Sequence, residues 1–105
     1  RDGIVIAKAD QDEINEQVLI AQTADTLLSM EGVDASFVVS KRDEDLVSIS
    51  ARSLGEVNVQ VIMEQLNGGG HLTNAATQLE GVTIDEAVER LKKVLDENVE
   101  GGNTE

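Results

Sequence analysis

Hydrophobic residues along this chain recur in short β-prone runs and in helical stripes. The continuous apolar run at residues 4–7 predicts a short buried strand. A helix is expected next, because Asp10 and Glu13 have the spacing of a capping box. The apolar residues of this helix form one stripe, which consists of Ile14, Val18, Ala21, Ala24 and Leu28. Leu19, Ile20 and Leu27 widen this stripe. Gly32 suits the C′ position that ends such a helix.

Two β-prone runs at residues 33–40 and 46–53 are joined by a short polar connection, which predicts an antiparallel hairpin. The second run alternates apolar residues with serines and an arginine, namely Val47, Ser48, Ile49, Ser50, Ala51 and Arg52. Successive side chains of a strand project to opposite faces. One face of the hairpin is therefore apolar, while the other is either an ordinary side open to water or a functional surface.

A second helix is predicted from its N-terminal signals. Asn58 suits the N-cap position, and Val57 and Ile62 have the spacing of a hydrophobic staple around it. The helical pattern ends at residues 67–68, where asparagine and glycine follow each other.

The last part of the chain predicts one more strand and one more helix. Residues 75–79 are the strand, and Thr83 with Glu86 forms a capping box before an amphipathic helix. The apolar face of that helix consists of Ile84, Ala87, Val88, Leu91, Val94 and Leu95. We therefore expect a single small α/β domain over residues 1–99, with a mixed, roughly four-stranded sheet and three helices in the order β-α-β-β-α-β-α. Residues 100–105 are expected to be a disordered tail.

The predicted core draws on every predicted element except the strand at residues 75–79. It consists of Ile6, Val18, Leu28, Phe37, Val39, Ile49, Ile62, Val88 and Leu91. Asp25 lies among apolar neighbours in the first helix, and we interpret it as a residue at a solvated edge.

The net charge of −13 restricts the ligands that this domain can bind. A nucleic-acid binder usually carries a positive field that neutralises phosphates. It also commonly stacks bases on aromatic side chains, and Phe37 is the only aromatic residue here. The composition therefore argues against nucleic acid as a partner, and an anionic ligand would need a local group of cations. Lys8 and Arg52 are the two cations in or beside β-prone segments.

Length and composition also bear on the cellular setting. A chain of 105 residues is long enough for one modest core. The absence of cysteine excludes disulfides and thiolate metal sites and suits a reducing cytoplasm. No apolar stretch approaches the roughly 20 residues of a membrane span, so no direct membrane contact is expected of this domain. Because the chain begins with Arg1, we expect it to be a piece of a longer protein.

Three adjacent glycines, Gly68, Gly69 and Gly70, stand directly before His71, the only histidine. Consecutive glycines let main-chain N–H groups approach an anion closely, and the imidazole adds a donor. The run is therefore either a phosphate-binding loop or a helix C-cap followed by a mobile connection. It is not a P-loop, because it follows a helix instead of opening one and lacks the lysine.

Catalytic signatures are absent from the sequence. There is no G-x-S-x-G elbow, and one histidine without cysteine leaves only carboxylates as metal ligands, none of them in EF-hand spacing. Read from its residues, the domain binds and does not catalyse.

Four short motifs carry a resemblance to a known family. They are Ile49-Ser50-Ala51-Arg52-Ser53, Asn58-Val59, Gly68-Gly69-Gly70-His71 and Ala75-Ala76. Together they resemble the DHH-associated C-terminal domain of DHH-family phosphoesterases. Longer strings at residues 21–28, 35–38, 52–55 and 71–79 resemble the cyclic-di-AMP phosphodiesterases of the GdpP type. Members usually carry another glycine where Asn67 stands, and asparagine tolerates the left-handed conformation.

The resemblance implies a division of labour between two domains. In such enzymes a separate DHH catalytic domain of the same chain holds manganese ions, and the Asp-His-His signature is absent here. The smaller domain binds the cyclic dinucleotide, and the resemblance implies a phosphate site at Arg52, Ser53 and the run Gly68, Gly69, Gly70 and His71. It also implies a bacterial parent, anchored in the cell membrane, that hydrolyses cyclic-di-AMP to linear pApA with this domain in the cytoplasm.

Two other functions stay open on the sequence. The chain is alternatively a nucleic-acid-binding module of a DHH-type exonuclease, or a structural or dimerisation domain in which Arg52 and His71 bind nothing. In each case we expect no catalytic residue and no metal ligand in this chain, so only the parent protein would be an enzyme.

Overall fold

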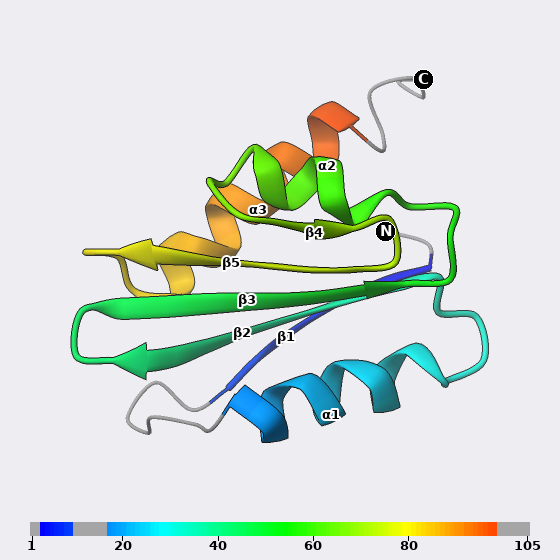
Figure 1. Ribbon diagram of the computed structural model, residues 1–105, viewed down its shortest axis with the longest axis horizontal. Helices are drawn as coiled ribbons and strands as arrows, with labels where there is room; N and C mark the ends of the chain where they lie inside the picture. Colours follow the sequence, from blue (N-terminus) through cyan, green and yellow to red (C-terminus); the bar gives the residue numbers. More distant parts are fainter. Residues whose placement is uncertain (1–2, 10–16, 99–105) are drawn as a thin grey trace.

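A mixed five-stranded sheet in the order β1-β2-β3-β5-β4 organises the chain (Figure 1). The structure is a computed structural model that describes residues 3–9 and 17–98. Its elements are β1 (Ile4–Lys8), α1 (Gln17–Leu28), β2 (Ala35–Asp43), β3 (Leu46–Ser53), α2 (Val59–Glu64), β4 (Gly69–His71), β5 (Asn74–Glu80) and α3 (Ile84–Asn98). Strand β1 is parallel to β2, and the other neighbours are antiparallel. The predicted α/β class with a mixed sheet and three helices is confirmed.

The glycine run supplies the strand that the sequence pattern did not predict. Gly69–His71 forms the edge strand β4, with Gly69 opposite Ala76 and His71 opposite Asn74 in β5. The element order is therefore β-α-β-β-α-β-β-α. Glycine is depleted in strands and a three-residue strand has no apolar alternation, so only its pairing with β5 defines it.

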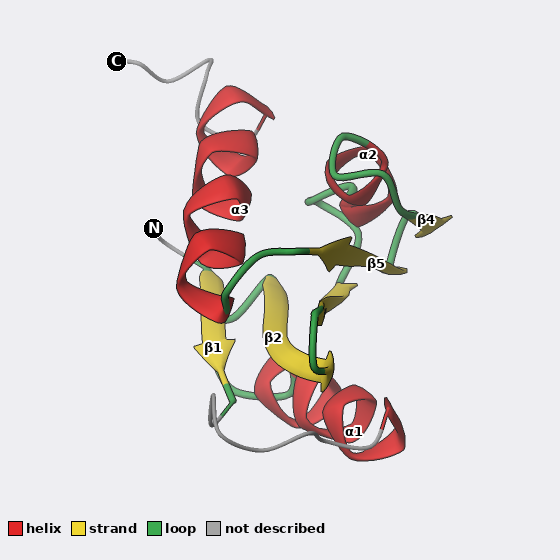
Figure 2. Ribbon diagram, turned by 90° about the vertical axis from the view of Figure 1, so that its left-hand side faces the viewer, coloured by secondary structure: helices red, strands yellow, loops and turns green. Residues whose placement is uncertain are grey.

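Helices cover the two faces of the sheet, α1 on one side and α2 with α3 on the other (Figure 2). The side facing α2 and α3 holds the main core, to which Phe37, Ile49 and Leu91 contribute. The side facing α1 holds a smaller core built on Ile20, Ala24 and Val38. Strands β2 and β3 are therefore covered on both sides, which explains why most of their residues are buried.

The serines of the hairpin lie beneath α1, so a side open to water is the wrong interpretation for them. Ser48 and Ser50 are 2% and 1% exposed. The Ser36 hydroxyl donates a 2.7 Å hydrogen bond to the main-chain carbonyl of Ala24 in α1. These small side chains allow the helix backbone to approach the sheet closely. The hydrogen bond of the Ser36 hydroxyl to the helix replaces the hydrogen bond to water that the hydroxyl loses on burial.

Helix α1 is rotated about its axis relative to the predicted stripe. Ile20 and Ala24 are buried, whereas Val18 is 62% exposed. Apolar residues fill positions 18 to 21 without interruption, so the periodicity does not single out one face. The bond from Ser36 to Ala24 shows which face is turned inward. Of the predicted core, Phe37, Val39, Ile49, Ile62, Val88 and Leu91 are buried, Ile6 and Leu28 are half-buried, and Val18 is exposed.

The hairpin and both later helix starts are confirmed. Phe37 lies opposite Ala51 in the antiparallel pair of β2 and β3. The Asn58 side chain accepts a 3.2 Å hydrogen bond from the Val61 N–H and caps α2. Thr83 and Glu86 exchange side-chain to main-chain hydrogen bonds of 2.8 and 3.0 Å at the start of α3. The apolar face predicted for α3 is the face that is buried.

Two predictions fall on residues outside the described ranges. They are the capping box at Asp10 and Glu13, with Ile14 after it, and the tail at residues 100–105. Within residues 3–9 and 17–98, no helix has the length and apolar character needed to cross a membrane.

Candidate functional site

One cross-strand row of side chains brings the predicted arginine and histidine to the same sheet face. Ser36 of β2 lies opposite Arg52 of β3, Arg52 opposite Asn74 of β5, and Asn74 opposite His71 of β4. Directly paired residues project from the same side of a sheet. Because the Ser36 hydroxyl binds the backbone of α1, all four side chains lie on the α1 side. We call Arg52, Asn74 and His71 the polar row.

Helix α1 covers only part of this face. It packs against β2 and β3, while β5 and β4 lie farther from it (Figure 1). Ser36 is accordingly buried, Arg52 is half-buried, and Asn74 and His71 are exposed. The polar row thus runs from the edge of the helix outward to the open edge of the sheet.

A flat strip of small residues lies beside the polar row. Ser50, Ala76 and Gly69 are neighbours across β3, β5 and β4 and share the same face. A Cβ built on Gly69 would meet no atom within 4 Å. Ser50 is buried beneath α1, so the open part of this strip lies at Ala76 and Gly69, next to the guanidinium and the imidazole.

The other two glycines serve the packing of β4 against β5. A Cβ on Gly70, whose φ is +144°, would lie 2.5 Å from Ala75 Cα and from the Asn74 carbonyl oxygen. A Cβ on Gly68 would collide with the Ala76 carbonyl and with Thr77. Gly68 and Gly70 are required because backbone approaches backbone there, whereas Gly69 is open.

Asn67 occupies the left-handed position that ends the turn after α2. Its φ is +69°, and its N–H donates to the Glu64 carbonyl at 3.1 Å. The Gly68 N–H donates to the Met63 carbonyl at 2.8 Å, which completes the paired bonds of a Schellman motif. The start of the glycine run therefore belongs to a helix C-cap, which is one of the two interpretations of the sequence. The cap is followed by the edge strand β4 and not by the mobile connection that this interpretation expected. Asn67 thus adopts the left-handed conformation that glycine, the residue that the resemblance implies here, also tolerates.

The Arg52 side chain is held by two hydrogen bonds. Its Nε donates to Asp25 Oδ1 at 3.0 Å, and its Nη1 donates to the Ala51 carbonyl at 2.9 Å. The side chain of Arg52 is 14% exposed and that of Asp25 is 64% exposed. Asp25 does lie at a solvated edge, and it also pairs with the arginine. Sequence spacing gave no signal for this pair, since 27 positions separate the residues.

Ser53 and His71 differ in their surroundings. The Ser53 hydroxyl accepts a 2.8 Å hydrogen bond from the Gly55 N–H, and the residue is 4% exposed. Its N–H donates to the Thr73 carbonyl at 3.0 Å, which ties the end of β3 to the turn between β4 and β5. The exposed His71 imidazole has no hydrogen-bond partner within the part of the chain that the structure describes.

The structure thus divides the predicted site residues into two groups. Arg52, Gly69 and His71 lie together on the open face, joined by Asn74, which the sequence analysis did not single out. Gly68, Gly70 and Ser53 form the framework that fixes β4 and the end of β3. Asn74 directly precedes the strand predicted at residues 75–79, and its place opposite the arginine becomes visible only once the strands are paired.

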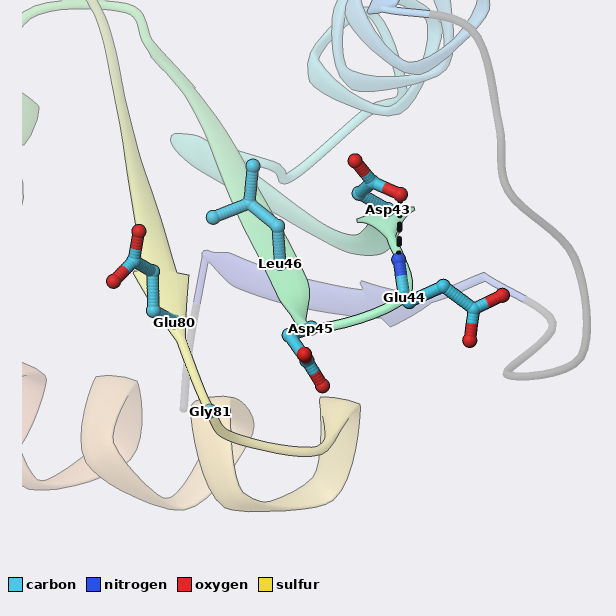
Figure 3. Close-up of a pocket in the computed structure, with 6 residues that line it drawn as sticks. All are labelled: Asp43, Glu44, Asp45, Leu46, Glu80 and Gly81. Carbon is cyan, nitrogen blue, oxygen red and sulfur yellow. Dashed lines mark hydrogen bonds between the residues drawn. The ribbon is translucent and has the colours of Figure 1, made fainter.

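A pocket of about 740 Å³ lies at the other end of the sheet, lined by Asp43, Glu44, Asp45, Leu46, Glu80 and Gly81 (Figure 3). Leu46 begins β3 and Arg52 lies near its end, about 20 Å away at the usual rise per residue. The carboxylates that line this pocket point in different directions in Figure 3, and their negative charges disfavour the binding of an anion. No group of three or more His, Cys, Asp or Glu in the described residues is arranged to hold a metal ion.

The sequence is similar to known proteins over most of its length. The chain is 64% identical over 100 residues to the cyclic-di-AMP phosphodiesterase GdpP of Geobacillus thermodenitrificans, which covers 95% of the chain and 15% of that protein. It is 60% identical over 95 residues to the cyclic-di-AMP phosphodiesterase PdeA of Listeria monocytogenes, covering 90% of the chain and 14% of that protein. The chain therefore spans about 15% of the length of these relatives.

The fold is also similar to a solved structure. An exopolyphosphatase-related protein from Bacteroides fragilis superposes with a TM-score of 0.74 at 23% sequence identity, over 88% of this chain and 28% of that one. At this identity the likeness shows the fold alone. The family model of the DHHA1 domain matches residues 2–101, nearly the whole sequence. The chain is a member of the DHHA1 domain family.

Proposed function

We propose that this chain is the substrate-binding domain of a cyclic-di-AMP phosphodiesterase and that the polar row binds a phosphate of the dinucleotide. The observation that carries the proposal is the convergence of Arg52 and His71 beside the open strip at Gly69. A guanidinium fork and an imidazole N–H are suited to phosphate oxygens. They form a local group of donors in a chain whose net charge is −13.

The rest of the predicted site supports the row from behind. In this proposal, the close approach of Gly68 and Gly70 to β5 holds β4 in register, which fixes the imidazole of His71 relative to Arg52. Ser53 fixes the end of β3 through its bond with Gly55. Gly69 is the glycine of the run at which a Cβ would meet no other atom, so the space beside it on the face of the polar row is open.

The remaining functions of the parent follow from its relatives and are part of the proposal. The proteins named GdpP and PdeA are cyclic-di-AMP phosphodiesterases, and this chain corresponds to about 15% of their length. We place the manganese ions in a separate DHH domain that hydrolyses the dinucleotide to pApA. The parent would be anchored in the bacterial membrane by segments outside this chain.

A titration of cyclic-di-AMP into the chain tests the proposal. The expected result is binding by the wild type that is about 10- to 150-fold weaker in Arg52→Ala and in His71→Ala, with unfolding curves showing that both variants fold. Equal affinity in all three proteins would overturn the binding role and favour a structural domain. Tighter binding to single-stranded oligonucleotides, with a steep dependence on salt, would favour the nucleic-acid module instead.

A further inference from the structure

The carboxylate of Asp25 restrains the plane of the Arg52 guanidinium. Oδ1 of Asp25 accepts the 3.0 Å hydrogen bond from Nε, at the point where α1 passes the end of β3. The second restraint is the 2.9 Å bond from Nη1 to the Ala51 carbonyl. An arginine side chain has many rotamers, and two bonds from different nitrogens fix both its position and the orientation of its plane.

The helix that carries Asp25 is itself fixed at this level of the sheet. The neighbouring residue Ala24 is fully buried, and its carbonyl accepts the 2.7 Å hydrogen bond from Ser36. Ser36 is the residue directly opposite Arg52 in the sheet. The turn of α1 that presents the carboxylate is thus fastened to β2 beside the arginine that it contacts.

The two bonds also determine which donors Arg52 can offer to a ligand. A guanidinium has five N–H groups, and the bonds to Asp25 and Ala51 use two of them. The other three N–H groups have no partner among the residues that the structure describes. The remaining N–H groups lie on Nη1 and Nη2, an arrangement that matches two oxygens of one phosphate. We infer that Asp25 is a positioning residue, which orients Arg52 for phosphate before the ligand arrives. This inference rests on the proposed function.

The negative charge of Asp25 acts in the opposite direction, since it repels an anionic ligand. Because the side chain is 64% exposed, water and salt screen this repulsion. Loss of the restraint frees a long side chain that must be ordered again on binding, which weakens affinity by a factor of about 3 to 10. Positioning is therefore expected to outweigh repulsion, and the two effects are separable by substitution.

The experiment compares Asp25→Ala with Asp25→Asn in the 105-residue chain, using cyclic-di-AMP as the probe. Asparagine keeps an oxygen acceptor and removes the charge, whereas alanine removes both. We expect Asp25→Ala to weaken binding about 3- to 10-fold and Asp25→Asn to match or exceed wild-type affinity. In the Arg52→Ala background, Asp25→Ala should cause no further loss, because the carboxylate acts through the guanidinium.

The Arg52 Nε–H signal in a ¹H–¹⁵N spectrum gives a readout that does not depend on the ligand. We expect a slowly exchanging signal in the wild type and in Asp25→Asn, and its loss in Asp25→Ala. Three results would each overturn the inference: tighter ligand binding by Asp25→Ala, an unchanged Nε–H signal in that variant, or the same loss of affinity on Asp25→Ala substitution with and without Arg52. No binding by the wild type would overturn the proposed function and the inference with it. Because wild-type binding is measured first, this outcome is distinguished from a failure of the inference alone.

Discussion

The hydroxyl of Thr77 in β5 donates a 2.6 Å hydrogen bond to the carbonyl of Leu66, at the turn that follows α2. Both residues are buried, at 4% and 6% exposure. The bond joins the residue just before Asn67 and the glycine run to β5, the strand with which β4 pairs. It therefore helps to place β4 at the edge of the sheet, and with it the imidazole of His71.

Replacement of this hydroxyl should destabilise the domain. Thr77→Val has nearly the same shape but leaves the buried Leu66 carbonyl without its donor, so we expect a loss of about 1–3 kcal/mol. Thr77→Ser keeps the hydroxyl and should lose about 1 kcal/mol for the missing methyl. Urea unfolding followed by circular dichroism measures both, since the chain has no Trp or Tyr. A Val variant as stable as the wild type would contradict a role for the bond.

The three glycines should respond differently to alanine. Gly70→Ala meets the backbone of β5 and has a φ of +144°, and Gly68→Ala meets the Ala76 carbonyl, so each should destabilise by about 1–3 kcal/mol. Gly69→Ala, which enters open space, should change stability by less than about 0.5 kcal/mol. The same methyl should weaken cyclic-di-AMP binding, because it rises from the strip beside Arg52. Equal destabilisation of all three would show that β4 is not packed in this way.

The left-handed conformation at Asn67 gives a test of the departure from the family pattern. With a φ of +69°, Asn67→Gly should keep the stability of the wild type. Asn67→Val should lose about 1–2 kcal/mol, since a β-branched residue tolerates that conformation poorly. Thermal unfolding of the three proteins checks this, and a stable Val variant would contradict the Schellman ending of the α2 turn.

Arg52 and His71 should affect ligand affinity more than folding. Loss of a charged hydrogen bond to phosphate costs about 1.5–3 kcal/mol, so each alanine variant should bind cyclic-di-AMP about 10- to 150-fold more weakly. His71→Ala should leave stability unchanged because the side chain is exposed. Arg52→Ala should lose about 1 kcal/mol with its bond to Asp25. Arg52→Lys is the matched control, which keeps the charge without the fork.

The isolated chain should bind without turning over its ligand. The sequence lacks the Asp-His-His signature of the catalytic domain, and the proposed function assigns the metal ions to that domain. We therefore expect no pApA from cyclic-di-AMP when manganese is added. Chromatography of the reaction products measures this, and turnover near the rate of an intact phosphodiesterase would refute the division of labour.

Local signals in the sequence were sufficient for most of the elements. The caps at Asn58 and at Thr83 with Glu86, the hairpin of β2 and β3, and the buried face of α3 all formed as expected. Each depends on residues close together in the chain, so spacing alone carries the information. The motif around Arg52 and the run before His71 identified the family in the same way.

Contacts between separate elements decided the rest. Helix α1 has apolar residues on nearly every side, and the bond from Ser36 to Ala24, not periodicity, shows that Val18 faces water. Strand β4 exists because Gly68 and Gly70 let the chain approach β5.

The sequence by itself determined the helices, the hairpin and the residue types that suit a phosphate. The tertiary structure decided which of them meet: Arg52, Asn74 and His71 in one row, with Asp25 against the arginine. Strand pairing and helix docking set these neighbours, and both depend on the packing of the whole sheet, which no local spacing encodes.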